Sequence, residues 1–85
     1  MKIVFTKHTE FKFKILKRHK FLVTRDQIED IIKRPEKVKK GKSNRLIAQK
    51  SISKTHLIRV IYERNDEIRD ITFYPARRWR YEGQI

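Results

Sequence analysis

Two apolar, β-branched runs in the C-terminal part of the chain constrain its fold more than any other feature. The runs are LIRVIY at 57–62 and IRDITFY at 68–74, and a polar stretch containing Asn65-Asp66 lies between them. Val, Ile, Thr, Tyr and Phe suit a pleated, half-buried surface, and an Asn-Asp pair tolerates the tight backbone of a turn. The pattern therefore predicts a β-hairpin. Pro75 has no backbone donor and is expected to end the second strand.

The N-terminal part predicts one strand and one helix. Residues 2–6 (KIVFT) have the composition of a short strand. Residues 8–20 fit the strand period and the helix period about equally well. Their length and the lack of a turn residue favour a helix of about three turns.

A second helix follows, and its ends are marked in the sequence. Thr24 and Gln27 form a capping box, which starts the helix. An apolar stripe made by three isoleucines continues it, and Pro35 ends it. The basic segment 37–42 (KVKKGK) is expected to be a solvated loop that turns at Gly41.

Residues 45–52 (RLIAQKSI) predict a third strand, and 53–55 predict a turn into the hairpin. The resulting order is strand, two helices and a three-stranded antiparallel meander. We therefore predict an α+β domain whose two helices pack on one face of a mostly antiparallel sheet. The length of 85 residues and the 38% hydrophobic content are those of a single domain, 1–85, with a small core.

The charge is the strongest global signal. Twenty-three Lys and Arg stand against ten Asp and Glu, which gives a formal net charge of +13. A solvated surface adapted to heat would carry many glutamates beside its lysines, and here the acids are few. The acids gather in the second helix and around the hairpin turn, so we expect a basic face that binds a polyanion.

Several classes of function lack their sequence signals. The chain has no cysteine, no zinc-ligand spacing and only two glycines, so no metal and no cofactor are expected. Glu67 and Asp70 stand beside the hairpin turn and are expected to be solvated. No run approaches the roughly 18 apolar residues of a membrane span, and the first ten residues lack the apolar region of a signal peptide. A cytoplasmic protein that does not bind membranes is the expectation.

The hairpin and its tail resemble a known family. The segments 59–63 (RVIYE) and 71–82 (ITFYPARRWRYE) are similar to small prokaryotic proteins allied to the RelE/ParE toxin superfamily, in particular to its BrnT-like branch. That branch also ends its last strand in an Arg-rich, Tyr-containing tail. His8 followed by a basic helix, and a second helix that ends in Pro35-Glu36 with Val38, suit the same family. The turn at 19–21 departs from it, because a glycine is common there. The resemblance covers nearly the whole chain and implies a RelE-like fold.

The resemblance also implies a function. Members of this superfamily are type II toxins, commonly metal-independent endoribonucleases that cut mRNA, in some cases on the ribosome. A small acidic antitoxin protein, encoded beside the toxin, neutralises them. Some relatives inhibit gyrase instead. The charge alone suits a third possibility, a non-catalytic nucleic-acid-binding domain.

Metal-free RNA cleavage needs a base for the ribose 2′-OH, cations for the phosphorane and an acid for the leaving 5′-oxygen. Histidine is the natural base because its pKa lies near neutrality. The chain has three histidines, His8, His19 and His56. We assign His8 to catalysis and His19 to RNA binding and keep His56 as a candidate base. Each of the three also suits a capping or half-buried polar role.

Arg59 is the second catalytic candidate. It interrupts an apolar strand, so its side chain must face away from the core or find a partner there. On an open sheet face its guanidinium group would clamp a phosphate. The alternative is an ion pair with Asp70 or Glu67. Lys50 and Lys54 are expected to extend the RNA-binding patch.

The tail that follows Pro75 carries the remaining candidates. Arg77 is assigned to catalysis, and Arg78 and Arg80 are expected to contact phosphates. Tyr81, also assigned to catalysis, would donate a proton or stack on a base. Trp79 would stack on RNA or pack in the core.

Overall fold

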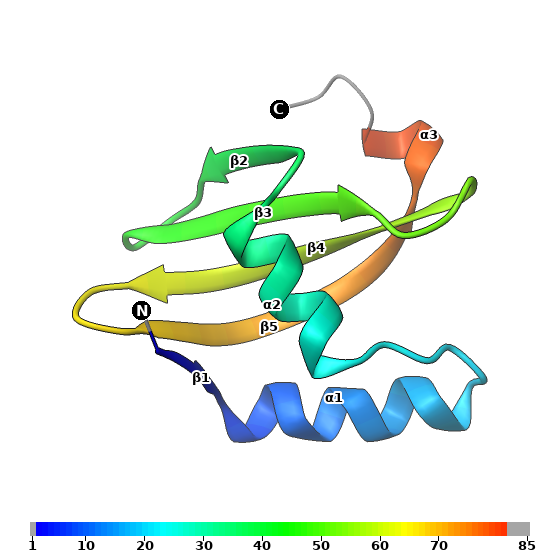
Figure 1. The fold of residues 1–85 in the computed structure, drawn as a ribbon, viewed down its shortest axis with the longest axis horizontal. Coiled ribbons are helices and arrows are strands. Elements are labelled where there is room, and N and C mark those ends of the chain that lie inside the picture. The colour runs from blue at the N-terminus through cyan, green and yellow to red at the C-terminus, as the bar shows by residue number, and fades with distance from the viewer. Residues whose placement is uncertain (1, 82–85) are drawn as a thin grey trace.

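The computed structural model describes residues 2–81, which form a five-stranded sheet and three helices (Figure 1). The side chains of Arg80 and Tyr81 are not among the described parts. In chain order the elements are β1 (Ile3–Phe5), α1 (Lys7–Arg18), α2 (Arg25–Lys33), β2 (Lys37–Lys40), β3 (Arg45–Ser51), β4 (His56–Arg64), β5 (Ile68–Arg77) and α3 (Arg78–Tyr81).

The strands lie in the order β1-β5-β4-β3-β2. β1 pairs with β5 in parallel, and all the other neighbours are antiparallel. The predicted α+β class is confirmed, as are the predicted hairpin and the capped second helix. The predicted three-stranded antiparallel meander is only part of the sheet. β1 and β2 add one strand at each edge of β3–β5, which makes a five-stranded mixed sheet.

The segment predicted as a basic loop is a strand. Lys37–Lys40 forms β2 and pairs with β3 through a tight turn. Ser43 and Asn44 have φ values of 57° and 61°, and the backbone N–H of Arg45 donates to the carbonyl of Lys42 at 3.1 Å. Two central residues with positive φ are the mark of a type I′ hairpin turn. Because β2 is an edge strand, its lysines can stay in solvent while its backbone pairs with β3.

The prediction that Pro75 ends the last strand is also wrong. β5 continues to Arg77, and Pro75 lies opposite Ile58 of β4. β1 pairs with β5 only at Ile68–Asp70, so no described strand borders β5 on that side beyond Asp70. A proline whose missing N–H would face an open edge costs the sheet no hydrogen bond.

Both long helices pack on one face of the sheet, as predicted (Figure 1). The ring of Phe13 on α1 lies 4.8 Å from that of Phe73 on β5. Ile28 and Ile31 of α2 belong to the same buried cluster as Phe73, with exposed fractions of 0% and 1%. The other face of the sheet is covered by neither of these helices.

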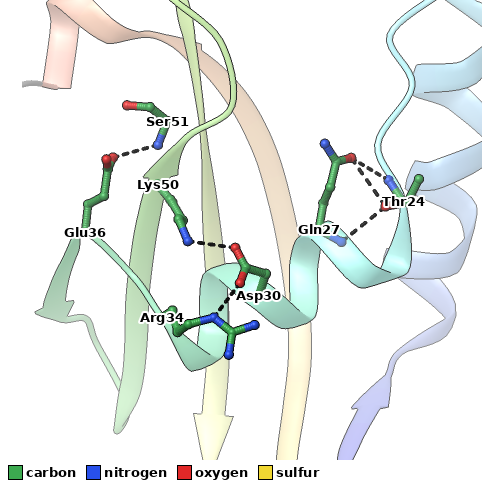
Figure 2. Close-up of polar contacts among 7 residues, drawn as sticks. All are labelled: Thr24, Gln27, Asp30, Arg34, Glu36, Lys50 and Ser51. Carbon is green, nitrogen blue, oxygen red and sulfur yellow. Dashed lines mark hydrogen bonds and ion pairs between the residues drawn. The ribbon is translucent and has the colours of Figure 1, made fainter.

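Local signals explain how the helices begin and end. Thr24 accepts a hydrogen bond from the backbone of Gln27, whose side chain accepts one from the backbone of Thr24 (Figure 2). α1 ends in a Schellman motif, in which the N–H of Phe21 donates to the carbonyl of Leu16 at 2.9 Å. Lys20 takes the position usually given to glycine, with a φ of 61°.

The largest difference from the prediction within the core is the position of Asp70. Expected in solvent, it is completely buried, and a β-bulge lies next to it where the β4–β5 register shifts between Ile61 and Tyr62. An extra residue in one strand reverses which face the following side chains take. Asp70 therefore faces α1, where the hydroxyl of Thr9 donates to its backbone carbonyl at 3.1 Å.

Candidate nucleic-acid interface

Two of the predicted tail arginines, Arg77 and Arg78, lie where β5 passes into α3. The backbone N–H of Arg78 donates to the carbonyl of Thr55 at 2.9 Å, and its Nη1 lies 3.4 Å from the carbonyl oxygens of Ser53 and Lys54. These contacts hold the start of α3 against the β3–β4 turn. A hollow of about 210 Å³ results, which we call the clamp hollow; it is lined by Lys54, Thr55, Arg77, Arg78 and Trp79.

The clamp hollow gathers cations and one exposed aromatic ring. Lys54, Arg77 and Arg78 bring three positive charges to it from two separate parts of the chain. Trp79 is 73% exposed, so of its two expected roles the structure leaves stacking accessible and excludes core packing. The side chains of Arg80 and Tyr81, predicted to act here, lie outside the described parts.

His56 is the histidine that lies beside the tail. It is the direct cross-strand partner of Arg77, and opposed residues in antiparallel strands have Cβ atoms about 5 Å apart. Its Nδ1 lies 2.8 Å from the hydroxyl of Thr55, and its ring packs edge-on against Phe21 at 5.7 Å. These two contacts fix the orientation of the imidazole.

His8 and His19 lie elsewhere. His8 is exposed in the first turn of α1, whose N-cap residue Thr6 donates to the carbonyl of Ile71 at 3.3 Å. Ile71 and Arg77 are six residues apart along β5, which is about 20 Å of strand. His19 is the exposed C-cap of α1. The fold thus separates His8, assigned to catalysis, from the tail arginines.

Arg59 lies on the sheet face that α1 and α2 leave uncovered, opposite Gln49 on β3 and Tyr74 on β5. Its guanidinium carbon is 5.9 Å from the centroid of the Tyr74 ring, and the residue is only 9% exposed. The expected ion-pair alternatives are excluded. Asp70 faces α1, and Glu67 lies in the turn beyond the far end of β4.

Lys50 and Arg59 do not form a common RNA-binding patch. Its Nζ lies 2.7 Å from Oδ2 of Asp30 on α2, which also accepts from Arg34 (Figure 2). These two cations lower the pKa of Asp30. Since neighbouring strand residues alternate in face, Lys50 lies on the helix side and Gln49 on the uncovered side. Lys50 therefore ties α2 to β3, and it belongs to no patch with Arg59.

Sequence reasoning missed a second hollow on the other side of Arg78. Its volume is about 260 Å³, and we call it the Glu36 hollow. It is lined by Glu36, Lys37, Gln49, Ser51, Leu57 and Arg78. Oε1 of Glu36 accepts the backbone N–H of Ser51 at 2.7 Å (Figure 2). This hydrogen bond is the main cause that lowers the pKa of Glu36, and the charges of Arg78 and Lys50 add to it. The Pro35-Glu36 pair was the only sequence signal, and it does not point to a hollow.

The charges are divided along the strands. Glu63, Asp66 and Glu67 line a hollow at the β4–β5 turn, at the opposite end of β4 from His56. No group of three or more His, Cys, Asp or Glu residues within 2–81 could hold a metal ion. Lysines lie both on α1 and on β2, and β2 is the edge strand of the sheet farthest from β1.

Comparison of the chain with protein-family models, with curated proteins and with solved structures finds no match. The RelE-like and BrnT-like resemblance stays a prediction. None of the helices in residues 2–81 is long and apolar enough to cross a membrane.

Proposed function

We propose that this protein is an RNA-cleaving toxin whose site is the clamp hollow and the adjoining His56. The supporting observation is the meeting of His56 with Arg77 and Arg78 at one end of the sheet. A histidine base and neighbouring guanidinium groups are what cleavage by the ribose 2′-OH requires.

In this proposal RNA binds with its scissile phosphate at Arg77 and Arg78. His56 takes the proton of the 2′-OH through Nε2, since its Nδ1 is engaged by the hydroxyl of Thr55. The 2′-oxygen attacks phosphorus, and the guanidinium groups stabilise the charge of the phosphorane. The bond to the 5′-oxygen breaks as that oxygen gains a proton from a water molecule, and His56 then releases the proton of the 2′-OH to the hydroxide that is left. The products are a 2′,3′-cyclic phosphate and a 5′-hydroxyl end.

The proposal is tested with purified protein and a defined single-stranded RNA, free and on translating ribosomes, in the presence of EDTA. We expect cleavage that EDTA leaves unchanged and products with cyclic phosphate ends. Arg78→Ala should abolish most of the activity. Lys14→Ala, which removes one equal charge from α1, is the matched control and should not.

A non-catalytic nucleic-acid-binding domain is the second candidate. The spread of positive charge over α1 as well as the sheet favours it, because cleavage needs only the local cations. Such a protein would bind RNA with an affinity that falls steeply with salt and depends little on sequence. If the protein binds RNA but cleaves neither free nor ribosome-bound RNA, this second candidate function is the correct one.

The toxin proposal includes a protein partner. A domain with a net charge of +13 attracts acidic protein surfaces, and a partner that covers its phosphate site would inhibit it. We propose a small acidic antitoxin that lies over the clamp hollow. Co-expression with the product of the adjacent gene should restore growth of cells that the protein alone arrests, whereas a plain RNA binder should not arrest them.

A further inference from the structure

The Glu36 hollow and the clamp hollow share one wall. Arg78 lines both of them, so its side chain lies between the clamp hollow and the Glu36 hollow. A polynucleotide whose phosphate lies at Arg78 therefore brings an adjacent nucleotide to the Glu36 hollow. Leu57 also lines the hollow, although at 2% exposed it adds little apolar surface to it.

Glu36 is a fixed, charged acceptor in this hollow. The backbone N–H of Ser51 holds Oε1 at 2.7 Å, and the lowered pKa keeps the group ionised at neutral pH. An ionised carboxylate has about four lone-pair sites, so one hydrogen bond leaves most of its accepting capacity. A ligand group that reaches the Glu36 carboxylate must therefore donate an N–H or O–H bond to it.

Gln49 adds a second acceptor. The residue is 4% exposed, and its Oε1 has no hydrogen-bond partner in the described chain. A buried acceptor without a partner is destabilising, and a donor supplied by a ligand would remove that cost. The terminal torsion of a glutamine is broad, so the amide can turn toward a ligand in the hollow that it lines.

We propose that the Glu36 hollow binds a guanine base of the RNA, which gives the proposed RNA-binding site a base preference. Guanine presents two adjacent donors, N1–H and N2–H, on its Watson–Crick edge, and these match the two oxygens of a carboxylate. Uracil presents one N–H between two carbonyl oxygens, which the charge of Glu36 repels. Adenine has an acceptor at N1. Single-stranded RNA is commonly read on this edge.

The inference rests on the proposed function, and binding experiments separate the two. An eight-nucleotide RNA of uracils with one central guanine is compared with the same RNA carrying inosine, adenine or uracil at that position. All four RNAs have non-cleavable 2′-O-methyl riboses. We expect the guanine RNA to bind roughly tenfold more tightly than the uracil RNA, the scale of one bidentate base contact. Inosine, which lacks the N2 amine, should lose most of that gain.

The variant Glu36→Gln tests the assigned residue. Glutamine keeps an Oε1 for the N–H of Ser51 and loses the carboxylate, so the fold should be retained while the guanine preference disappears. Binding of the uracil RNA should not weaken. Glu29→Gln, an equal charge change on α2 outside the hollow, is the control and should keep the preference.

Three results would overturn the inference. Equal affinity of the wild-type protein for all four RNAs would contradict it and leave the proposed RNA binding intact. A guanine preference that survives Glu36→Gln would show that another site reads the base. Failure of the wild-type protein to bind any of the RNAs at low salt would overturn the proposed function together with the inference.

Discussion

The hydroxyl of Thr9 lies 3.1 Å from the backbone carbonyl oxygen of Asp70 and 3.5 Å from its Oδ1, inside the core between α1 and β5. Burial raises the pKa of the Asp70 carboxyl to about 7, and the hydrogen bond from Thr9 opposes only part of that rise. A buried carboxyl group of this kind makes the folded state prefer the protonated acid.

Stability should therefore fall as the pH rises toward neutrality. The folded state holds the Asp70 proton up to about pH 7, whereas the unfolded chain releases it near the ordinary value of 3.8. The folded state binds more protons between these values, so the contribution is complete below pH 4 and is lost as the pH rises through 7. The full loss is roughly 4 kcal/mol at about 1.4 kcal/mol per pKa unit.

Urea denaturation at pH 5 and pH 8 measures the part of this loss that falls between the two pH values, roughly 3 kcal/mol at about 1.4 kcal/mol per pKa unit. Asp70→Asn keeps an acceptor for the hydroxyl of Thr9 and cannot ionise, so its midpoint should depend less on pH than the wild-type midpoint. Glu29→Gln serves as the control because Glu29 is not buried. Identical pH dependence of the wild type and Asp70→Asn would refute the assignment.

A second prediction concerns the end of α1. Lys20 sits in the left-handed region with a φ of 61°, which costs a residue with a Cβ atom about 1 kcal/mol. Lys20→Gly should therefore stabilise the protein by about 0.5–1 kcal/mol in thermal or urea unfolding. Lys17→Gly, a matched change inside the helix, should destabilise it by about 1 kcal/mol. Loss of stability in Lys20→Gly would mean that the Schellman turn is not strained.

The third prediction concerns the capping box of α2. Thr24→Ala removes the oxygen that accepts the backbone N–H of Gln27 at 3.1 Å and should cost about 1 kcal/mol. Thr24→Ser keeps that oxygen and should cost little. Equal losses in the two variants would assign the effect to the methyl group of Thr24 and contradict the cap.

The sequence predicted the features that depend on local patterns. The hairpin follows from two β-branched runs, and the capping box follows from Thr24 and Gln27. The β2 strand was missed because three of its four residues are lysine, and its turn uses Ser43-Asn44, which lacks the glycine of the usual signal. No local pattern announces a β-bulge, so the burial of Asp70 was missed as well.

For the candidate site too, the sequence predicted what depends on neighbouring residues and missed what depends on strand register. The tail arginines are neighbours in sequence, so they were grouped from the sequence alone, and Arg77 and Arg78 do line the same hollow. The register decides which histidine joins them, and it pairs His56 with Arg77. The sequence places His8 at the start of the first helix, and no pattern in it shows that this helix begins at the other end of β5.

The last prediction separates the histidines by activity. If His56 is the base, His56→Ala should lower the rate of RNA cleavage by about 10²-fold or more, the usual contribution of a general base. His8→Ala should leave the rate within about twofold, because His8 lies roughly 20 Å away along the strand direction. Thermal unfolding of both variants controls for loss of fold, since His56 also packs against Phe21. A normal rate in His56→Ala with a large loss in His8→Ala would move the catalytic site to the N-terminus of α1.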